Sequence, residues 1–338
     1  MNSTTNTPQS ITDQFGRVHN YLRISLTERC NLRCFYCMPE EGIALSEKEN
    51  VLTHEEIIVL TKEFVALGVN KIRLTGGEPL IKKNIEKIIR ELTALPISLG
   101  ITTNGILLDK YIDLFKECGV KDINISLDTL DKDKFELMTL RDYYDRVMSN
   151  IYQCILAGFN VKINAVLIKG TNDNEIVDFI EFTKDKNVSL RFIEFMPFDG
   201  NKWDTSKVVS LNDVLEKVNG HYAESEIIKL EDKKHDTTKN YRIKGYKGSF
   251  GVISTVSNPF CDSCNRIRLT ANGRIKNCLF SAEETNLLEP LRAGEDLVSH
   301  ILEAVYPKKK SRGGMISDED FFDKEKNTKN RAMISIGG

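Results

Sequence analysis

The chain has 338 residues, enough for one large α/β domain with an extension or for two medium domains. Its 47 basic and 49 acidic side chains give a formal net charge of −2, without the basic excess usual in proteins that bind nucleic-acid phosphates. Residues 1–14 have the composition of a flexible polar tail with no secretory signal, and no apolar run approaches the roughly 18 residues of a membrane helix. We therefore expect a cytoplasmic protein with no nucleic acid and no membrane as partner.

From Tyr21 to Met196 short β-rich segments alternate with longer helical patterns, which is typical of parallel βαβ units. The first helix is expected after Thr53, which forms a capping box with Glu56. Six units are too few for an eight-stranded barrel and enough for a partial one. The strands are expected at residues 22–26, 71–74, 98–103, 122–127, 161–168 and 190–195.

After Pro197 the pattern changes, so we place a boundary at residue 200 between a barrel region (15–200) and a C-terminal region (201–338). Residues 229–239 are highly charged and are expected to form an exposed loop. A strand-rich segment follows at 241–254. One apolar-periodic helix is expected from about 287 to 305.

Side chains alternate between the two faces of a strand, so parity separates the helix-facing residues from the interior ones. Five cations share the polar parity, and they are Arg23, Lys71, Arg73, Lys162 and Arg191. Burying them unpaired would be very costly, so they predict an anionic occupant or a wet cavity. The alternative is a set of half-exposed strands with one face in solvent.

Six of the eight cysteines form two triads, while Cys118 and Cys154 lie in helical patterns and are expected to pack in the core. The first triad, Cys30, Cys34 and Cys37, has the spacing CxxxCxxC directly after the first strand. Three thiolates can hold three irons of a cubane cluster and leave the fourth iron open for another ligand. A zinc site is the alternative, but no histidine with ligand spacing lies nearby to close a tetrahedron.

This motif resembles the radical S-adenosylmethionine superfamily. The segment from Thr75 to Pro79, TGGEP, is similar to the superfamily's glycine-rich loop near the methionine moiety, where a residue without a side chain lets the ligand approach. A simple strand-to-helix turn opened by Pro79 is the alternative. The resemblance implies a [4Fe-4S] cluster that binds S-adenosylmethionine and cleaves it to a 5′-deoxyadenosyl radical.

The second triad, Cys261, Cys264 and Cys278, also leaves one iron open if it holds a cluster, and a zinc site completed by a distant residue is the alternative. Arg266 and Arg268 lie on one face between these cysteines. Guanidinium groups bind phosphates through two hydrogen bonds, so this pair favours a phosphate-binding role over surface ion pairing.

Together the motifs closely resemble the GTP 3′,8-cyclase (MoaA) family of molybdenum-cofactor biosynthesis, from residue 15 to residue 338. They are CNLRCFYC, TGGEP, TTNG, INISLD, RFIEFMP, CDSCNRIRL and the terminal Gly-Gly. The resemblance implies an α/β fold, an incomplete (βα)6 TIM-like barrel whose mouth is closed by a C-terminal iron–sulfur domain. It also implies the reaction, in which hydrogen is removed from C3′ of the GTP ribose and this carbon is joined to C8 of guanine.

The family resemblance implies two [4Fe-4S] clusters and the following site residues. S-adenosylmethionine would contact Tyr36, Gly77, Ser126 and Met196. GTP would contact Arg23, Lys71, Arg73, Thr102, Lys162, Arg191, Arg266 and Arg268. Arg266, Arg268, Gly337 and Gly338 would act in catalysis, with the Gly-Gly tail reaching into the active site, although a frayed end is the usual interpretation of two terminal glycines.

The expected partners are GTP, an external one-electron donor, a downstream pyranopterin-forming enzyme and a second copy of the chain in a homodimer. One rival interpretation is a radical enzyme with an auxiliary cluster that acts on a peptide, although such enzymes generally use more cysteines. Another is a non-catalytic iron–sulfur carrier or a zinc-bearing interaction module, which the cationic interior disfavours.

Overall fold

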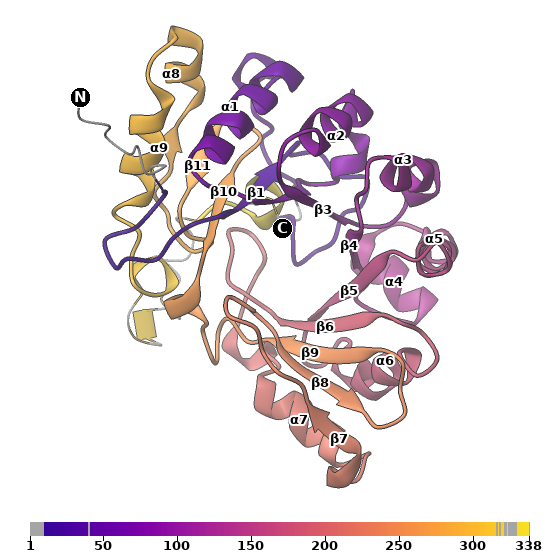
Figure 1. Ribbon diagram of the computed structural model, residues 1–338. Helices are drawn as coiled ribbons and strands as arrows, with labels where there is room; N and C mark the ends of the chain where they lie inside the picture. The colour runs from indigo at the N-terminus through magenta and orange to yellow at the C-terminus, as the bar shows by residue number, and fades with distance from the viewer. Residues whose placement is uncertain are drawn as a thin grey trace, which may run out of the picture.

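The computed structural model describes residues 10–39, 41–315, 317, 319–320, 323 and 330–337. In this part of the chain, twelve strands form one sheet that curves into an open arc, with helices along its outer side (Figure 1). The sheet order is β12-β11-β10-β1-β2-β3-β4-β5-β6-β9-β8-β7. Strands β1 to β6 pair in sequence order and in parallel, as expected for a partial barrel.

All six predicted barrel strands are confirmed, each boundary to within one residue. They are β1 (Tyr21–Ser25), β2 (Lys71–Thr75), β3 (Ser98–Thr103), β4 (Asp122–Ser126), β5 (Asn160–Leu167) and β6 (Ser189–Glu194). The helices between and after them are α1 (His54–Ala66), α2 (Ile85–Thr93), α3 (Ile112–Glu117), α4 (Lys132–Thr139), α5 (Tyr144–Leu156) and α6 (Ile176–Phe182). The capping box is confirmed, since the Thr53 hydroxyl accepts from the Glu56 amide and the Glu56 carboxylate accepts from the Thr53 amide.

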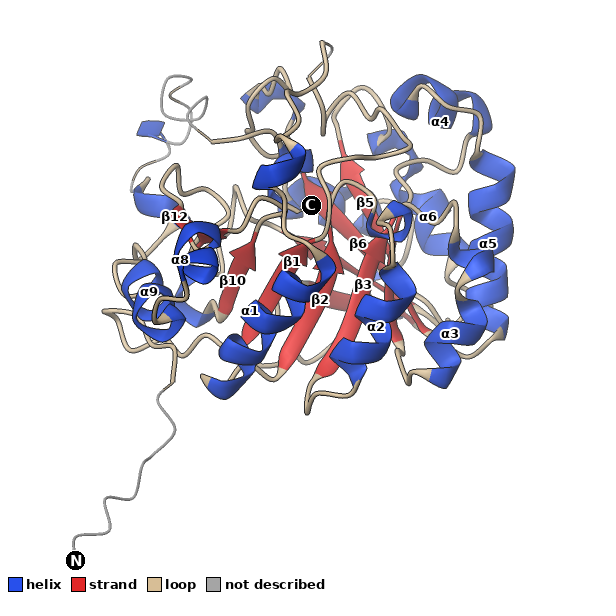
Figure 2. Ribbon diagram, turned by 90° about the horizontal axis from the view of Figure 1, so that it is seen from above, coloured by secondary structure: helices blue, strands red, loops and turns tan. Residues whose placement is uncertain are grey.

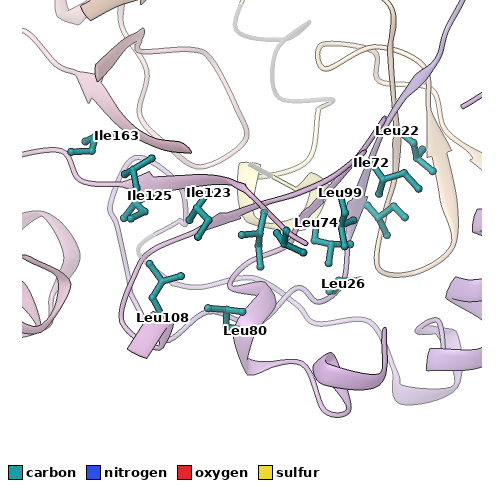
Figure 3. Close-up of a cluster of buried hydrophobic side chains, with 14 of the residues drawn as sticks. Leu22, Leu26, Ile72, Leu74, Leu80, Leu99, Leu108, Ile123, Ile125 and Ile163 are labelled. Atoms are coloured by element: carbon teal, nitrogen blue, oxygen red, sulfur yellow. The ribbon is translucent and has the colours of Figure 1, made fainter. Parts of the chain in front are cut away.

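Helices α1, α2 and α3 lie along the outer side of the sheet (Figure 2). The apolar parity of the strands belongs to the buried core. Leu22, Ile72, Ile123 and Ile163 are almost completely buried in this layer (Figure 3). Cys154 lies inside the same core and Cys118 packs against it, so their predicted packing role is confirmed. The opposite parity is left to line the interior of the arc.

The C-terminal region continues the sheet at both ends. Its strands are β7 (Ile227–Lys229), β8 (Lys239–Ile243), β9 (Ser249–Ile253), β10 (Arg266–Leu269), β11 (Arg274–Lys276) and β12 (Thr285–Asn286), and its helices are α7 (Leu211–Asn219), α8 (Leu288–Ala293), α9 (Leu297–Val305) and α12 (Met333–Ile336). Strand β9 pairs in parallel with β6, and β10 pairs in parallel with β1. The expected closure of the barrel mouth by a separate C-terminal domain is thus not confirmed, because these strands widen the sheet itself. The boundary at residue 200 stays a prediction.

Short helical turns connect several of these elements. They are η1 (Lys48–Asn50), η2 (Pro79–Ile81), η3 (Leu108–Lys110), η4 (Asp173–Glu175), η5 (Thr205–Lys207), η6 (Glu224–Glu226), η7 (Cys261–Ser263) and η8 (Arg312–Gly314). Two of them carry parts of the predicted motifs, since η2 begins at the proline of TGGEP and η7 contains the first cysteine of the second triad.

Three expectations from the sequence need correction. The single helix at 287–305 is two helices, because Gly294 adopts a left-handed conformation that ends α8 and Asp296 caps the start of α9. The charged segment at 229–239 is only partly exposed, because Thr238 is buried and lines the central cavity together with His235 and Thr237. The predicted tail at 1–14 is packed from residue 11, since Ile11 is fully buried, while residues 1–9 lie outside the described residues.

Within the described residues, no helix has both the length and the apolar character needed to cross a membrane.

Candidate active site

A cavity of about 350 Å³ lies inside the arc of strands, within the size range of small-molecule sites. It is lined by every residue predicted to contact S-adenosylmethionine or GTP: Tyr36, Gly77, Ser126, Met196, Arg23, Lys71, Arg73, Thr102, Lys162, Arg191, Arg266 and Arg268. The three cysteines of the first triad line it as well. The strand-parity prediction of a polar interior is therefore confirmed, and the alternative of a sheet face open to solvent is wrong.

The strand register gathers the cations on neighbouring strands. Arg23 of β1 lies beside Arg73 of β2 and beside Arg268 of β10. On the other side of the arc, Asn124 of β4 pairs with Lys162 of β5. Because the strands are parallel and in register, residues that are far apart in sequence form one positively charged wall.

Two of these cations are held by protein groups. The Arg73 Nε donates to the Tyr21 hydroxyl and its Nη1 donates to the Ile101 carbonyl, both at 2.8 Å. The Lys162 Nζ lies 3.5 Å from the Asp122 carboxylate. Burial would raise the pKa of Tyr21, but the nearby Arg73, Arg23 and Lys71 outweigh burial and lower that pKa to about 8. The shift shows how strong the positive potential of the wall is.

Other cations keep donors for a ligand. Among the described residues, the Nε of Arg191 and the Nε and Nη2 of Arg266 have no hydrogen-bond partner, although both groups are buried. The Arg266 guanidinium also lies over the Phe260 ring, 4.8 Å from its centroid, which fixes its plane. Buried, unpaired donors of this charge predict an anion with several acceptor oxygens.

The first triad follows β1 at the carboxyl ends of the strands. The Cys34 carbonyl accepts from the amides of Cys37 and Met38, which closes the loop into a turn. The Gly77 amide donates to the Thr27 carbonyl and the Glu78 amide to the Arg29 carbonyl. The TGGEP loop therefore lies directly against the cysteine loop.

Gly77 is required by this close contact. A Cβ atom at residue 77 would lie 2.1 Å from the Arg29 carbonyl oxygen. The glycine was expected to leave space for a ligand, and the structure shows that it also leaves space for the backbone of the triad loop. Pro79 opens a short helical turn, as that interpretation expected, and the contact of the loop with S-adenosylmethionine stays a prediction.

The surroundings of the first triad are apolar and acidic. Burial raises the pKa of Cys37 to about 12, with further contributions from Cys30 and Asp128. Asp128 accepts from the Tyr36 hydroxyl at 2.5 Å and from the Val166 amide at 2.8 Å, and burial raises its pKa to about 6. These thiols stay protonated at neutral pH unless a metal cation displaces their protons.

The second triad lies beyond the other end of β1. Cys264 stands two residues before Arg266, which pairs with Tyr21, the first residue of β1. With about 3.3 Å per residue, the five residues of β1 separate the two triads by roughly 15 Å. The cysteines of the second triad do not line the cavity themselves; their neighbours Phe260, Arg266 and Leu279 do.

Cations surround the second triad. Burial raises the pKa of Cys264, but the Lys308 ammonium, 3.5 Å from its Sγ, and the Arg266 guanidinium outweigh burial and lower that pKa to about 7. The Arg312 amide donates to the Cys261 Sγ at 3.4 Å. Such donors stabilise thiolate ligands.

Both triads fit iron–sulfur clusters better than single ions. The thiols of each triad influence one another's pKa, so they share one site. Yet no three His, Cys, Asp or Glu side chains in the described chain are arranged to hold one metal ion. Ligands of one zinc ion must converge on a point, whereas thiolates that bind separate irons of a cubane stand farther apart. Three thiols in each triad match a cubane cluster with one iron left open.

The C-terminal tail enters the arc. The Arg268 Nη1 donates to the carbonyl oxygens of Ile336 and Gly337, and Met333 lines the cavity. Gly337 has a φ of 79°, and a Cβ there would lie 2.4 Å from the Thr75 Oγ1. The tail therefore contacts Arg268 as far as Gly337, its active-site role stays a prediction, and Gly338 lies outside the described residues.

Three buried carboxylates near the site were not singled out from the sequence. Glu78 accepts from Thr103 and from the Asn104 amide, and so joins TGGEP to TTNG. Glu194 accepts from Val256 and Ser257, and Asp128 accepts from Tyr36. Glu78 lies in TGGEP, Asp128 in INISLD and Glu194 in RFIEFMP, and this position inside the motifs is the signal that could have identified them.

Comparison with known proteins identifies close relatives. The chain is 49% identical over 332 residues to the mitochondrial GTP 3′,8-cyclase of Arabidopsis thaliana, covering 96% of this chain and 83% of that protein. It is 42% identical over 335 residues to the GTP 3′,8-cyclase of Listeria welshimeri, covering 98% and 100%. The human molybdenum cofactor biosynthesis protein 1 is 45% identical over 332 residues, covering 96% and 51%. The chain thus spans about half the length of that relative.

Solved structures and family profiles agree with the fold. Streptococcus suis SuiB has a TM-score of 0.61 at 18% identity, covering 89% of this chain and 68% of that one. The protein anSMEcpe with bound AdoMet has a TM-score of 0.57 at 15% identity, covering 89% and 83%. The radical SAM superfamily profile matches residues 24–183, and the molybdenum cofactor synthesis C profile matches 188–313. This chain belongs to the GTP 3′,8-cyclase family of radical SAM proteins.

Proposed function

We propose that the chain is a radical S-adenosylmethionine enzyme of the lyase class, a GTP 3′,8-cyclase that forms (8S)-3′,8-cyclo-7,8-dihydroguanosine 5′-triphosphate in molybdenum cofactor biosynthesis. The observation that carries this proposal is the cationic cavity between two cysteine triads at opposite ends of β1. A nucleoside triphosphate supplies the negative charge that the wall requires. The nucleoside triphosphate is also long enough to extend through a cavity with one cysteine triad at each end.

Residues near the amino-terminal ends of the strands would bind the triphosphate. Arg266 and Arg191 offer buried N–H donors that have no hydrogen-bond partner among the described residues. Lys162 and Arg23 line the same cavity and add positive charge. Each charge-assisted hydrogen bond to a phosphate is stronger than a neutral one, so the wall both attracts and orients GTP. Thr102 and Lys71 complete the proposed GTP contacts.

Cys30, Cys34 and Cys37 would hold the first [4Fe-4S] cluster, with Tyr36, Gly77, Ser126 and Met196 around S-adenosylmethionine, and Cys261, Cys264 and Cys278 would hold the second. When bound, the first cluster and S-adenosylmethionine supply the radical that removes hydrogen from C3′ of the ribose. The Tyr36–Asp128 hydrogen bond and the TGGEP contacts keep the first triad loop in place.

The tail would shape the reaction space together with Arg268. Ile336 is buried in an apolar cluster with Phe198, Val256 and Phe280, against which Met196 packs. These side chains exclude water from one side of the cavity. Gly337 and Gly338 would act next to the nucleotide, and the hydrogen bonds from Arg268 fix the tail carbonyls at that position.

Mass analysis of the product tests the proposal. The reduced enzyme, reconstituted without oxygen, is expected to hold two cubane clusters and to convert GTP into a cyclic dihydro-GTP as it cleaves S-adenosylmethionine. Cleavage without a GTP-derived product would support the peptide-modifying rival. Protein that binds zinc and no iron would support the interaction module and overturn the proposal.

The remaining partners follow from the proposed reaction. An external one-electron donor must reduce the first cluster, and a downstream pyranopterin-forming enzyme must consume the cyclic product. We also propose a homodimer and a cytoplasmic location. None of the eight cysteines forms a disulfide, which suits a reducing compartment. Size-exclusion chromatography with light scattering tests the dimer.

A further inference from the structure

A buried lysine reaches the second triad from a distant part of the sequence. Lys308 follows α9, and only 3% of its surface is exposed. Its Nζ donates to the Cys264 Sγ at 3.5 Å and to the Arg266 carbonyl at 2.8 Å. The ammonium group therefore contacts both a proposed cluster ligand and the backbone that carries a proposed phosphate ligand.

The surroundings of Lys308 contain no carboxylate partner within the part of the chain that the structure describes. Its Nζ contacts a thiol, a backbone carbonyl and the ring of His19, whose Nδ1 lies 3.5 Å from the Nζ. A buried ammonium without a counter-charge is strongly unfavourable. The group near Lys308 that can carry a negative charge is the Cys264 thiol. If Cys264 binds a cluster, it does so as a thiolate, which provides the counter-charge.

His19 holds Lys308 in this position. The His19 Nε2 donates to the Asp13 carboxylate at 3.0 Å, which leaves the lone pair of Nδ1 directed at the ammonium. Asp13 and His19 are both almost completely buried. Asp13 also accepts from the Arg17 Nε at 2.6 Å.

Arg17 ties the same segment to the triad a second time, since its Nη1 donates to the Cys261 carbonyl at 2.8 Å. Residues 11–19, which include part of the predicted tail, thus form a support beneath the second triad. Such supporting hydrogen bonds commonly orient metal ligands and tune the metal.

We propose that Lys308 is a positioning residue of the second cluster, which acts through its charged hydrogen bond to the Cys264 ligand and raises the reduction potential of that cluster. This inference rests on the proposed function, because it assumes that the second triad holds a cluster. Hydrogen bonds and positive charge near cluster sulfurs stabilise the reduced, more negative state. Among the residues that the structure describes, no lysine donates a hydrogen bond to a thiol of the first triad, and the Asp128 carboxylate near this triad acts in the opposite direction.

The test compares Lys308→Met with the wild type by redox titration of the reconstituted full chain, followed by electron paramagnetic resonance. To isolate the second cluster, both are also made with Cys30, Cys34 and Cys37 replaced by Ala. Loss of the ammonium is expected to shift the oxidised-to-reduced ratio of the second cluster at least about tenfold toward the oxidised state. For a one-electron couple this corresponds to a reduction potential about 59 mV lower. The potential of the first cluster should stay unchanged.

Three further variants make the result decisive. Lys310→Met removes an exposed lysine from the same segment and should leave both potentials unchanged. Lys308→Arg keeps the charge and should restore most of the reduction potential. If Lys308→Met cannot hold the second cluster, Lys308→Gln replaces it as the neutral variant. An unchanged potential in whichever neutral variant keeps that cluster overturns the inference. A wild-type protein with only one cluster would instead overturn the proposed function.

Discussion

The two cysteine triads differ in the charges that surround them. The first lies at the carboxyl ends of the strands, near Asp128, and burial raises the pKa of Cys37 to about 12. The second lies at the amino-terminal ends, near Lys308 and Arg266, where the pKa of Cys264 is lowered to about 7. The same ligand type is thus placed in an anionic site and in a cationic one. We infer that the first site lowers the reduction potential of its cluster, so that the reduced cluster is a strong reductant. The second site favours negative charge and therefore a nucleotide.

The sharpest way to break this comparison is to remove one ligand from each triad. Cys34→Ala should abolish the first cluster and reduce S-adenosylmethionine cleavage to background, because no centre remains to deliver the electron. Cys264→Ala should keep the first cluster and cleavage but lose the cyclic product. Iron analysis and product chromatography measure these effects. Equal loss of cleavage in both variants would mean that the two sites do not have separate roles.

The packing of the first triad loop predicts the next largest effect. Gly77→Ala forces a Cβ against the Arg29 carbonyl, at a cost of about 1–3 kcal/mol for overpacking, and should lower occupancy of the first cluster only. Gly220→Ala is the matched control, since its added Cβ has no neighbour closer than 3.4 Å. Iron content and thermal unfolding follow the two variants. A Gly77→Ala protein with full cluster content would refute the close contact.

The cationic wall predicts an effect on GTP binding alone. Arg266→Ala should raise the Kd for GTP about tenfold to a hundredfold, because charged hydrogen bonds to the phosphates are lost while both clusters remain. Arg292→Ala removes an arginine that pairs with Glu56 outside the cavity and should leave the Kd unchanged. Calorimetry without S-adenosylmethionine measures both. Normal affinity in Arg266→Ala would exclude this arginine from the phosphate site.

The last expected effect appears only at acidic pH and concerns the support of the second triad. Burial, with Lys308 nearby, lowers the pKa of His19 from 6.5 to about 4. As the pH falls, His19 is therefore protonated in the unfolded chain before it is protonated in the folded one. The contribution of neutral His19 to the free energy of unfolding, on the order of 3 kcal/mol, is full above pH 6.5 and is lost as the pH falls toward 4. His19→Gln should flatten the decline of the unfolding temperature over this range, and half-exposed His300→Gln should not. Parallel curves for wild type and His19→Gln would contradict the shift.

The fold and much of the site could be predicted because they depend on local patterns. Strand parity identified Arg23, Arg73 and Lys162 as interior residues, and the structure places all three around the cavity. The spacing of the cysteines identified both triads. The break at Gly294 was missed because the apolar periodicity continues across it, and only the left-handed backbone ends α8.

The sequence by itself determined the order of the six barrel strands, the side of each of them that faces inward and the chemical type of each ligand set. Only the tertiary structure decided that the two triads lie at opposite ends of β1, because β10 pairs with β1 across more than 200 intervening residues of chain. It also decided the partners of Lys308 and Gly337. Such contacts join distant segments, and no local periodicity encodes which of them meet.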